Sequence, residues 1–207
     1  MIKKSLLILI ITLTVGAFGI FVNTLVYATV YDPANIKSPN DIRIEKSLIA
    51  DGNYPARLVI PALRVNANIQ STTITKRGTM GTPTNFTDVA WYEYGVAPGS
   101  QGEAIIDGHV DNGLGLAGVF KNLKNIENGA DIFIVEQDGT KLHFEVTSIT
   151  YYNYKNVPMQ KFLTANGTPK LAFITCEGNW ISGEKTYDQR LVVETSLVGV
   201  VPATLTN

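Results

Sequence analysis

Short apolar segments separated by turn-forming residues run from residue 55 onwards, and they constrain the fold more than any other feature. Residues 58–60 form an apolar run that stops at Pro61, and residues 63–70 then alternate apolar and polar side chains. Further short apolar runs cover residues 89–92 and 104–106. An alternation with a period of two is typical of a half-buried strand, and helical periodicity is scarce here. We therefore predict an all-β domain over residues 55–207.

Three local patterns add detail to this domain. Two strand-like segments, residues 132–135 and 141–149, flank Asp138-Gly139, which predicts a β-hairpin with a type I′ turn. Apolar residues within 116–123 have helical spacing and predict one short helix. A short apolar turn covers residues 159–163. We expect one or two short helices beside the strands.

The amino terminus predicts a membrane anchor. Residues 5–30 are rich in Leu, Ile and Val and contain no charged side chain, and Lys3 and Lys4 precede them. A run of this length crosses a bilayer as a helix, and the lysines keep its start in the cytoplasm. We predict a single-pass anchor over residues 1–30 in the cell membrane, a Pro-, Asn- and Ser-containing linker over 31–54, and an extracytoplasmic domain. A cleaved signal peptide, with Ala28 in a small-residue cleavage site, is the alternative.

Composition excludes several classes of function. The formal net charge is -1, so the clustered Lys and Arg that nucleic-acid binding requires are missing. The single cysteine rules out an internal disulfide and a zinc site with four cysteines or with two cysteines and two histidines. We expect no nucleic-acid partner, no structural metal and no cofactor.

That single cysteine, Cys176, follows an apolar run. Residues 171–174 lead into Thr175 and Cys176, and Gly178 then breaks the run, which predicts a thiol at the end of a buried strand. A lone cysteine can also serve as a small buried hydrophobe. A nucleophilic role requires a base or a cation nearby to hold the thiolate.

The chain offers few partners for such a thiol. His109 follows another apolar run and Gly108, whereas His143 shares a strand face with Glu145 and is predicted to face solvent. Asp111 could orient the His109 imidazole or could be a solvated loop residue, and the sequence leaves both open. Arg190, the only arginine after the cysteine, opens the apolar run 191–193. His109, Cys176 and Arg190 are therefore the candidate catalytic residues, each at the end of a strand.

With these residues in view, the region 57–198 resembles the sortase family of cysteine transpeptidases. Its Thr-Cys pair is present, although Ala172 and Phe173 replace the first threonine and the leucine of the common Thr-Leu-x-Thr-Cys pattern. The Gly-His-Val-Asp run at residues 108–111 and the single anchor resemble sortase classes E and F more than the pilin-building class C. The segments that carry the resemblance are Leu58-Val59-Ile60-Pro61, Pro98-Gly99, Gly108-His109, Val119-Phe120 with Leu123, Thr175-Cys176 and Arg190-Leu191-Val192-Val193.

The resemblance implies a fold and a reaction. The family fold is an eight-stranded closed β-barrel with its site in a groove on the wall. Cys176 would attack a sorting-signal peptide resembling Leu-Pro-x-Thr-Gly, and an amine of a peptidoglycan precursor or of another protein would accept the acyl group. His109 would transfer the protons, Arg190 would contact the carbonyl oxygen, and Thr175 and Asp111 would contribute to substrate binding.

Two other functions remain open. L,D-transpeptidases also use a cysteine and a histidine, but their Ser-x-Gly-Cys-x-Arg setting is missing, because residues 177–181 contain no arginine and no glycine precedes Cys176. A membrane-tethered β-domain that only binds peptide or glycan, with an inert buried Cys176, is the second alternative. Reactivity of the folded protein towards iodoacetamide separates this alternative from an enzyme.

Overall fold

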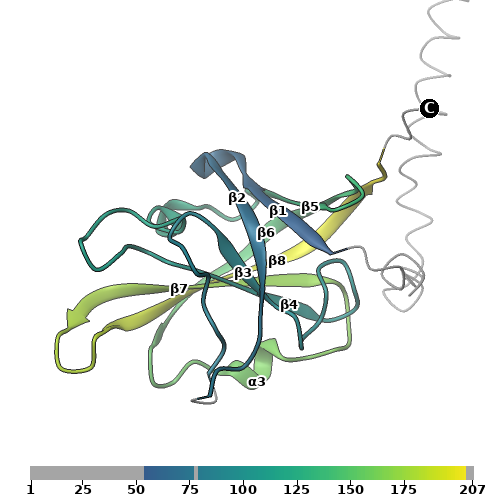
Figure 1. Cartoon of the computed structure of the whole chain (residues 1–207). Helices are drawn as coiled ribbons and strands as arrows, with labels where there is room; N and C mark the ends of the chain where they lie inside the picture. The colour runs from purple at the N-terminus through teal and green to yellow at the C-terminus, as the bar shows by residue number, and fades with distance from the viewer. Residues whose placement is uncertain (1–53, 77–78, 204–207) are drawn as a thin grey trace, which may run out of the picture. The chain divides into compact units, whose positions relative to one another are not determined.

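The computed structural model describes residues 54–76 and 79–203, and all eight strands in this part of the chain join one closed barrel (Figure 1). The strand order is β1-β2-β3-β4-β7-β8-β6-β5, with β5 returning to β1. The pairs β2/β3 and β4/β7 are parallel and the others antiparallel. The strands are β1 Pro55–Ile60, β2 Val65–Thr72, β3 Val89–Tyr92, β4 Glu103–Gly108, β5 Asp131–Glu136, β6 Lys141–Asn153, β7 Lys170–Ile181 and β8 Thr186–Val201. The predicted eight-stranded closed barrel is confirmed.

The predicted anchor and all of the predicted linker except Tyr54 lie outside the described residues. Within residues 54–76 and 79–203, no helix has the length and apolar character needed to span a bilayer.

Alternation along the strands separates the barrel interior from its outer wall. Alternate apolar residues, among them Ile106 on β4, Phe173 on β7 and Val193 on β8, are buried in one interior cluster. The ring of Phe173 meets that of Phe120 edge to face, with centroids 5.9 Å apart. A fully buried side chain of this size contributes on the order of 1.5–3 kcal/mol. The core thus fixes which residues of β4, β7 and β8 face outwards.

A second, smaller apolar cluster lies on the outer side of the same strands. Ile105, Ala172 and Val192 alternate with the interior residues and pack against Phe162 of the short helix α3, Met159–Phe162. The predicted apolar turn at 159–163 is therefore a single helical turn that covers part of the barrel wall. This cover lies next to the outward-facing residues of β4 and β7.

The helix predicted over residues 116–123 is wrong. The backbone of Gly118 donates to the Val110 carbonyl and that of Phe120 donates to the His109 carbonyl, so these groups pair with a distant segment. A Cβ on Gly118 would lie 2.3 Å from the His109 oxygen, so only glycine permits this approach. The remaining helical structure here is the 3₁₀ turn η2, Leu123–Asn125. A second 3₁₀ turn, η1 Pro61–Leu63, follows β1.

The β5/β6 hairpin forms as predicted, but its turn is not type I′. A type I′ turn requires a positive φ at both central residues, whereas Asp138 is not among the described residues with positive φ. Gly139 has a φ of 90° and donates to the Glu136 carbonyl, while Asp138 accepts from the Thr140 amide. The Asp138 side chain thus stabilises a different turn, with the left-handed residue at Gly139.

Gly178 does not end its strand, contrary to the prediction. β7 continues to Ile181, and its pairing with β8 shifts register between Glu177 and Trp180. Gly178 has a φ of 88°, and a Cβ there would lie 2.0 Å from an oxygen of Asp188. This is a β-bulge, a device that bends a strand and redirects side chains. Cys176 therefore lies just before a bulge within a long hairpin.

Candidate active site

Cys176 lies on the outer side of the barrel wall, directly opposite Arg190. The two residues are register partners in the antiparallel β7/β8 pair, so their side chains lie on the same face of the sheet. The neighbouring Thr175 points inwards, where it is only 1% exposed and its hydroxyl donates to the Gly108 carbonyl at 2.7 Å. The thiol of Cys176 is half-buried. Cys176 and Arg190 thus lie within long strands rather than at strand ends.

His109 is the first residue after β4 and is brought to the site by tight packing. A Cβ on the preceding Gly108 would lie 2.5 Å from the Phe120 ring, so glycine is needed where β4 meets the core. The imidazole lies 4.9 Å from the Phe86 ring, and its Nε2 is 3.2 Å from the Pro83 carbonyl oxygen. Because a carbonyl can only accept, this contact places a proton on Nε2. The loop carrying Pro83 and Phe86 therefore fixes the ring.

Two cavities meet at Cys176. We call the first the His109 cavity; it has a volume of about 440 Å³ and is lined by His109, Asp111, Cys176, Trp180, Lys185 and Tyr187, among others. We call the second the Arg190 cavity; it has a volume of about 540 Å³, and its lining includes Arg190, Cys176, Asp107, Tyr154, Ile105 and Met159. Cys176 lines both cavities, so this residue can be approached from either side.

Main-chain oxygens hold the Arg190 guanidinium. Its Nη1 donates to the carbonyls of Tyr187 at 3.1 Å and Gln189 at 2.9 Å, and its Nη2 donates to the Thr186 hydroxyl at 2.9 Å. The Tyr154 ring lies 5.8 Å from the guanidinium carbon, within the range of a cation–π contact. A guanidinium carries more N–H groups than these three bonds use. Arg190 can therefore offer a donor to a ligand while staying fixed.

Burial and nearby charges act on the thiol in opposite directions. Burial raises the pKa of Cys176, Arg190 lowers it, and the carboxyl groups of Asp107 and Asp111 raise it, so that the pKa is raised overall. Burial also raises the pKa of Asp107 to about 7, against the opposing effect of Arg190. Before a substrate binds, the thiol is therefore held in its protonated form at neutral pH.

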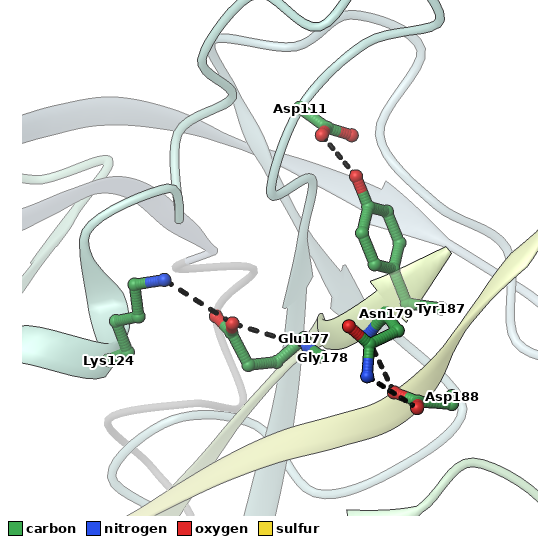
Figure 2. Close-up of polar contacts among 7 residues, drawn as sticks. All are labelled: Asp111, Lys124, Glu177, Gly178, Asn179, Tyr187 and Asp188. Atoms are coloured by element: carbon green, nitrogen blue, oxygen red, sulfur yellow. Dashed lines mark hydrogen bonds and ion pairs between the residues drawn. The ribbon is translucent and has the colours of Figure 1, made fainter.

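Asp111 contacts a tyrosine rather than the histidine. Its Oδ2 accepts the hydroxyl proton of Tyr187, which comes from β8 (Figure 2). This hydrogen bond and burial raise the pKa of Tyr187 to about 12. The hydrogen bond that the structure shows for the His109 imidazole goes to Pro83 instead, so Asp111 does not orient the ring as considered from the sequence.

Below these residues, the strand β7 is braced at the bulge. Lys124 contacts Glu177 at 3.4 Å, and Asp188 accepts the backbone amide of Asn179 at 2.7 Å (Figure 2). These contacts join η2 to β7 and one side of the hairpin to the other. They fix the hairpin end that carries Trp180 and Tyr187 into the His109 cavity.

His143 lies on the outer wall, as predicted. Its ring stacks on Phe133 with centroids 4.7 Å apart, and its Nε2 lies 2.7 Å from Asp131. Asp131, His143 and Glu145 form the one group among the described residues that could hold a metal ion. His143 pairs with Gly199, near the far end of β8 from Arg190, so this group is separate from the thiol.

The Sortase domain family model matches residues 58–198, which is more than half of the chain. The chain belongs to the sortase family. A sortase is a cysteine transpeptidase, which agrees with a single cysteine placed between a histidine and an arginine. No curated protein matches the sequence.

Solved sortase structures share this fold at low sequence identity. Sortase A from Corynebacterium diphtheriae aligns with a TM-score of 0.57 and 20% identity over 73% of this chain and 63% of that chain, so this sortase spans less than two thirds of that protein. Sortase C-1 from Actinomyces oris aligns with a TM-score of 0.54 and 22% identity, and the alignment covers 70% of this chain and 71% of that chain. Sortase A from Listeria monocytogenes aligns with a TM-score of 0.55 and 15% identity, and the alignment covers 73% of this chain and 92% of that chain. The assignment to class E or F stays a prediction.

Sequence reasoning missed two polar residues of this sortase's site. Asp107 is a charged residue that directly follows the apolar residues 104–106 of β4. This position could have marked it as a candidate site residue. Tyr187 gave no such signal, because its partner Asp111 is far away in sequence. The substrate-binding role of Thr175 stays a prediction. Its hydroxyl lies inside the barrel and donates a hydrogen bond to the Gly108 carbonyl.

Proposed function

We propose that this sortase cleaves a sorting-signal peptide through a thioacyl intermediate on Cys176 and transfers the acyl group to an amine of a peptidoglycan precursor or protein. The observation that carries the proposal is the position of Cys176, which lines both cavities. An inert structural cysteine would be enclosed by apolar side chains. A thiol open on two sides can instead receive one substrate from each side.

The Arg190 cavity has the chemistry for the peptide that supplies the acyl group. Apolar side chains from three elements line it, including Ile105 of β4, Ile174 of β7 and Met159 of α3. These surfaces match the apolar Leu and Pro of a Leu-Pro-x-Thr-Gly-type peptide. The carbonyl carbon before the scissile bond would then lie between the Cys176 thiol and the Arg190 guanidinium.

The reaction follows from these positions. As the peptide binds, the thiol proton passes to His109 and the thiolate attacks the carbonyl carbon. Negative charge moves to the carbonyl oxygen, where Arg190 offers N–H donors that are already oriented. His109 then protonates the leaving amine and later accepts a proton from the incoming one.

Mass spectrometry tests the intermediate. The full-length protein incubated with a Leu-Pro-x-Thr-Gly-type peptide should gain the mass of the peptide up to its threonine on Cys176, and hydroxylamine should release that acyl group. Cys176→Ala should show neither. Turnover of the peptide by Cys176→Ala, or a thiol in the folded protein that resists iodoacetamide, would favour a domain that only binds its ligand.

We further propose that residues 1–30 anchor the protein in the cell membrane with the catalytic domain outside. The support is the uncharged apolar run of residues 5–30 behind Lys3 and Lys4. Protease treatment of intact cells should degrade the catalytic domain. Protection of the domain until the cells are lysed would contradict this orientation.

A further inference from the structure

The two cavities at Cys176 divide the catalytic groups between them. His109 lines the His109 cavity but not the Arg190 cavity, and Arg190 lines only the latter. The proposed base therefore reaches the thiol from one side and the proposed oxyanion donor from the other. The two substrates of a transfer reaction would meet these groups from different sides.

The position of the base decides the side from which the acceptor enters. An incoming amine must lose a proton as it attacks, so it must lie within reach of His109 when it reaches the acyl carbon. The peptide part of the intermediate occupies the apolar Arg190 cavity. The amine therefore enters through the His109 cavity.

This entrance contains one fixed carboxylate, that of Asp111. The hydroxyl of Tyr187 holds its Oδ2, and a carboxylate retains further acceptor positions after one such bond. Asp111 is half-buried. Lys185, the one lysine lining this cavity, is exposed, so solvent screens its charge. Among the residues that line the cavity, Asp111 is the one that offers a carboxylate to a cation.

Resting on the proposed function, we propose that Asp111 is the acceptor-binding residue: it binds the protonated primary amine of the second substrate in the His109 cavity, and Tyr187 positions it. The sequence predicted a substrate-binding role for Asp111 without saying for which substrate. The geometry assigns it to the acceptor and makes the acceptor a cation in its bound state.

In the transfer step the bound ammonium group loses two protons. The bound ammonium R–NH₃⁺ first gives one proton to solvent and becomes R–NH₂. Its nitrogen attacks the thioester carbonyl, forming a C–N bond and breaking the C–S bond. The second proton passes from nitrogen to His109 and then to the departing thiolate of Cys176. Asp111 acts before the chemical step, so its loss should appear in KM for the amine rather than in kcat.

Two nucleophiles of different charge test this assignment on the full-length protein. Glycinamide is mostly protonated at neutral pH, whereas hydroxylamine is mostly uncharged. With a Leu-Pro-x-Thr-Gly-type peptide as acyl donor, Asp111→Asn should raise KM for glycinamide roughly tenfold, the size of a lost charge-assisted hydrogen bond. KM for hydroxylamine should change little. Glu127→Gln, which removes an exposed carboxylate that does not line the cavity, should leave both values unchanged.

Equal effects of Asp111→Asn on both nucleophiles, or no effect on either, would overturn the proposal. Wild-type protein supplies a second measurement that does not depend on the folding of a variant, because salt screens charge. Added salt should raise KM for glycinamide and not for hydroxylamine, and a salt-insensitive KM for glycinamide would also overturn it. If no acyl-enzyme forms at all, the proposed function fails instead, so the two failures are distinguishable.

Discussion

Glu103, at the start of β4, is a buried carboxyl group that should make the stability of this sortase depend on pH. It is 5% exposed, and its Oε1 is the one buried side-chain oxygen or nitrogen without a hydrogen-bond partner in the described part of the chain. Burial and the charge of Glu194 raise its pKa to about 7, against the effects of Lys170 and Lys161. The folded protein therefore holds this proton more tightly than the unfolded chain does.

The sign of the effect follows from that difference. Below the unfolded pKa of 4.5, both states are protonated and the carboxyl group costs nothing extra. As the pH rises from there through about 7, the unfolded state ionises first, and stability is lost. The difference between a pKa of 4.5 and one of about 7 corresponds to about 3 kcal/mol at pH 8. Glu103→Gln removes the ionisable group and should restore most of the stability that is lost at high pH.

Urea unfolding of the wild type and of Glu103→Gln at several pH values measures the effect. The difference in the free energy of unfolding, variant minus wild type, should grow by about 3 kcal/mol from about pH 4.5 to pH 8. This corresponds to roughly 6–12 °C in Tm for a domain of this size. A poorly bonded glutamine amide would shift the variant equally at every pH, so the change with pH carries the test. Glu127→Gln, at an exposed position, is the control. Parallel stability curves for wild type and Glu103→Gln would refute the reasoning.

Two further predictions concern the groups around the thiol. Arg190→Lys keeps the charge but loses the paired donors, so kcat/KM for the peptide should fall on the order of 10²–10³-fold. Its Tm should be unchanged, because Leu191 and Val193 stay buried. Near-wild-type turnover, or a fall in rate that is explained by unfolding, would contradict this. Asp107→Asn removes a charge that raises the pKa of Cys176, so the pH profile of iodoacetamide labelling should move to lower pH; a shift to higher pH would contradict it.

Much of the barrel could be predicted from the sequence because its signals are local. Alternation along residues 63–70 and the apolar run before His109 each reflect the two faces of one strand, and the strands β2 and β4 lie there. The closed order of eight strands came from the family resemblance, since alternation alone does not say which strands pair. The candidates His109, Cys176 and Arg190 followed from the scarcity of cysteine, histidine and arginine and from their positions beside apolar runs.

Three local predictions were wrong, the first two because backbone groups of other segments took part and the third because of a local side-chain hydrogen bond. Helical spacing at residues 116–123 was overridden because this segment pairs with residues 109 and 110. Gly178 was expected to stop a strand, but pairing with β8 carries the strand past it as a bulge. The Asp138-Gly139 turn differs because the Asp138 side chain bonds to the Thr140 amide. Propensity is a weak preference, and tertiary hydrogen bonds exceed it.

The electrostatics of the site were decided by the tertiary structure alone. Three interactions join different segments of the chain: the bond between Asp111 and Tyr187, the opposition of Cys176 and Arg190 across β7 and β8, and the influence of Arg190 on Asp107. The sequence determines which ionisable groups the chain carries, but their pKa values depend on burial and on charges a few ångströms away. Those distances are set only when the barrel closes and brings β4, β7 and β8 side by side.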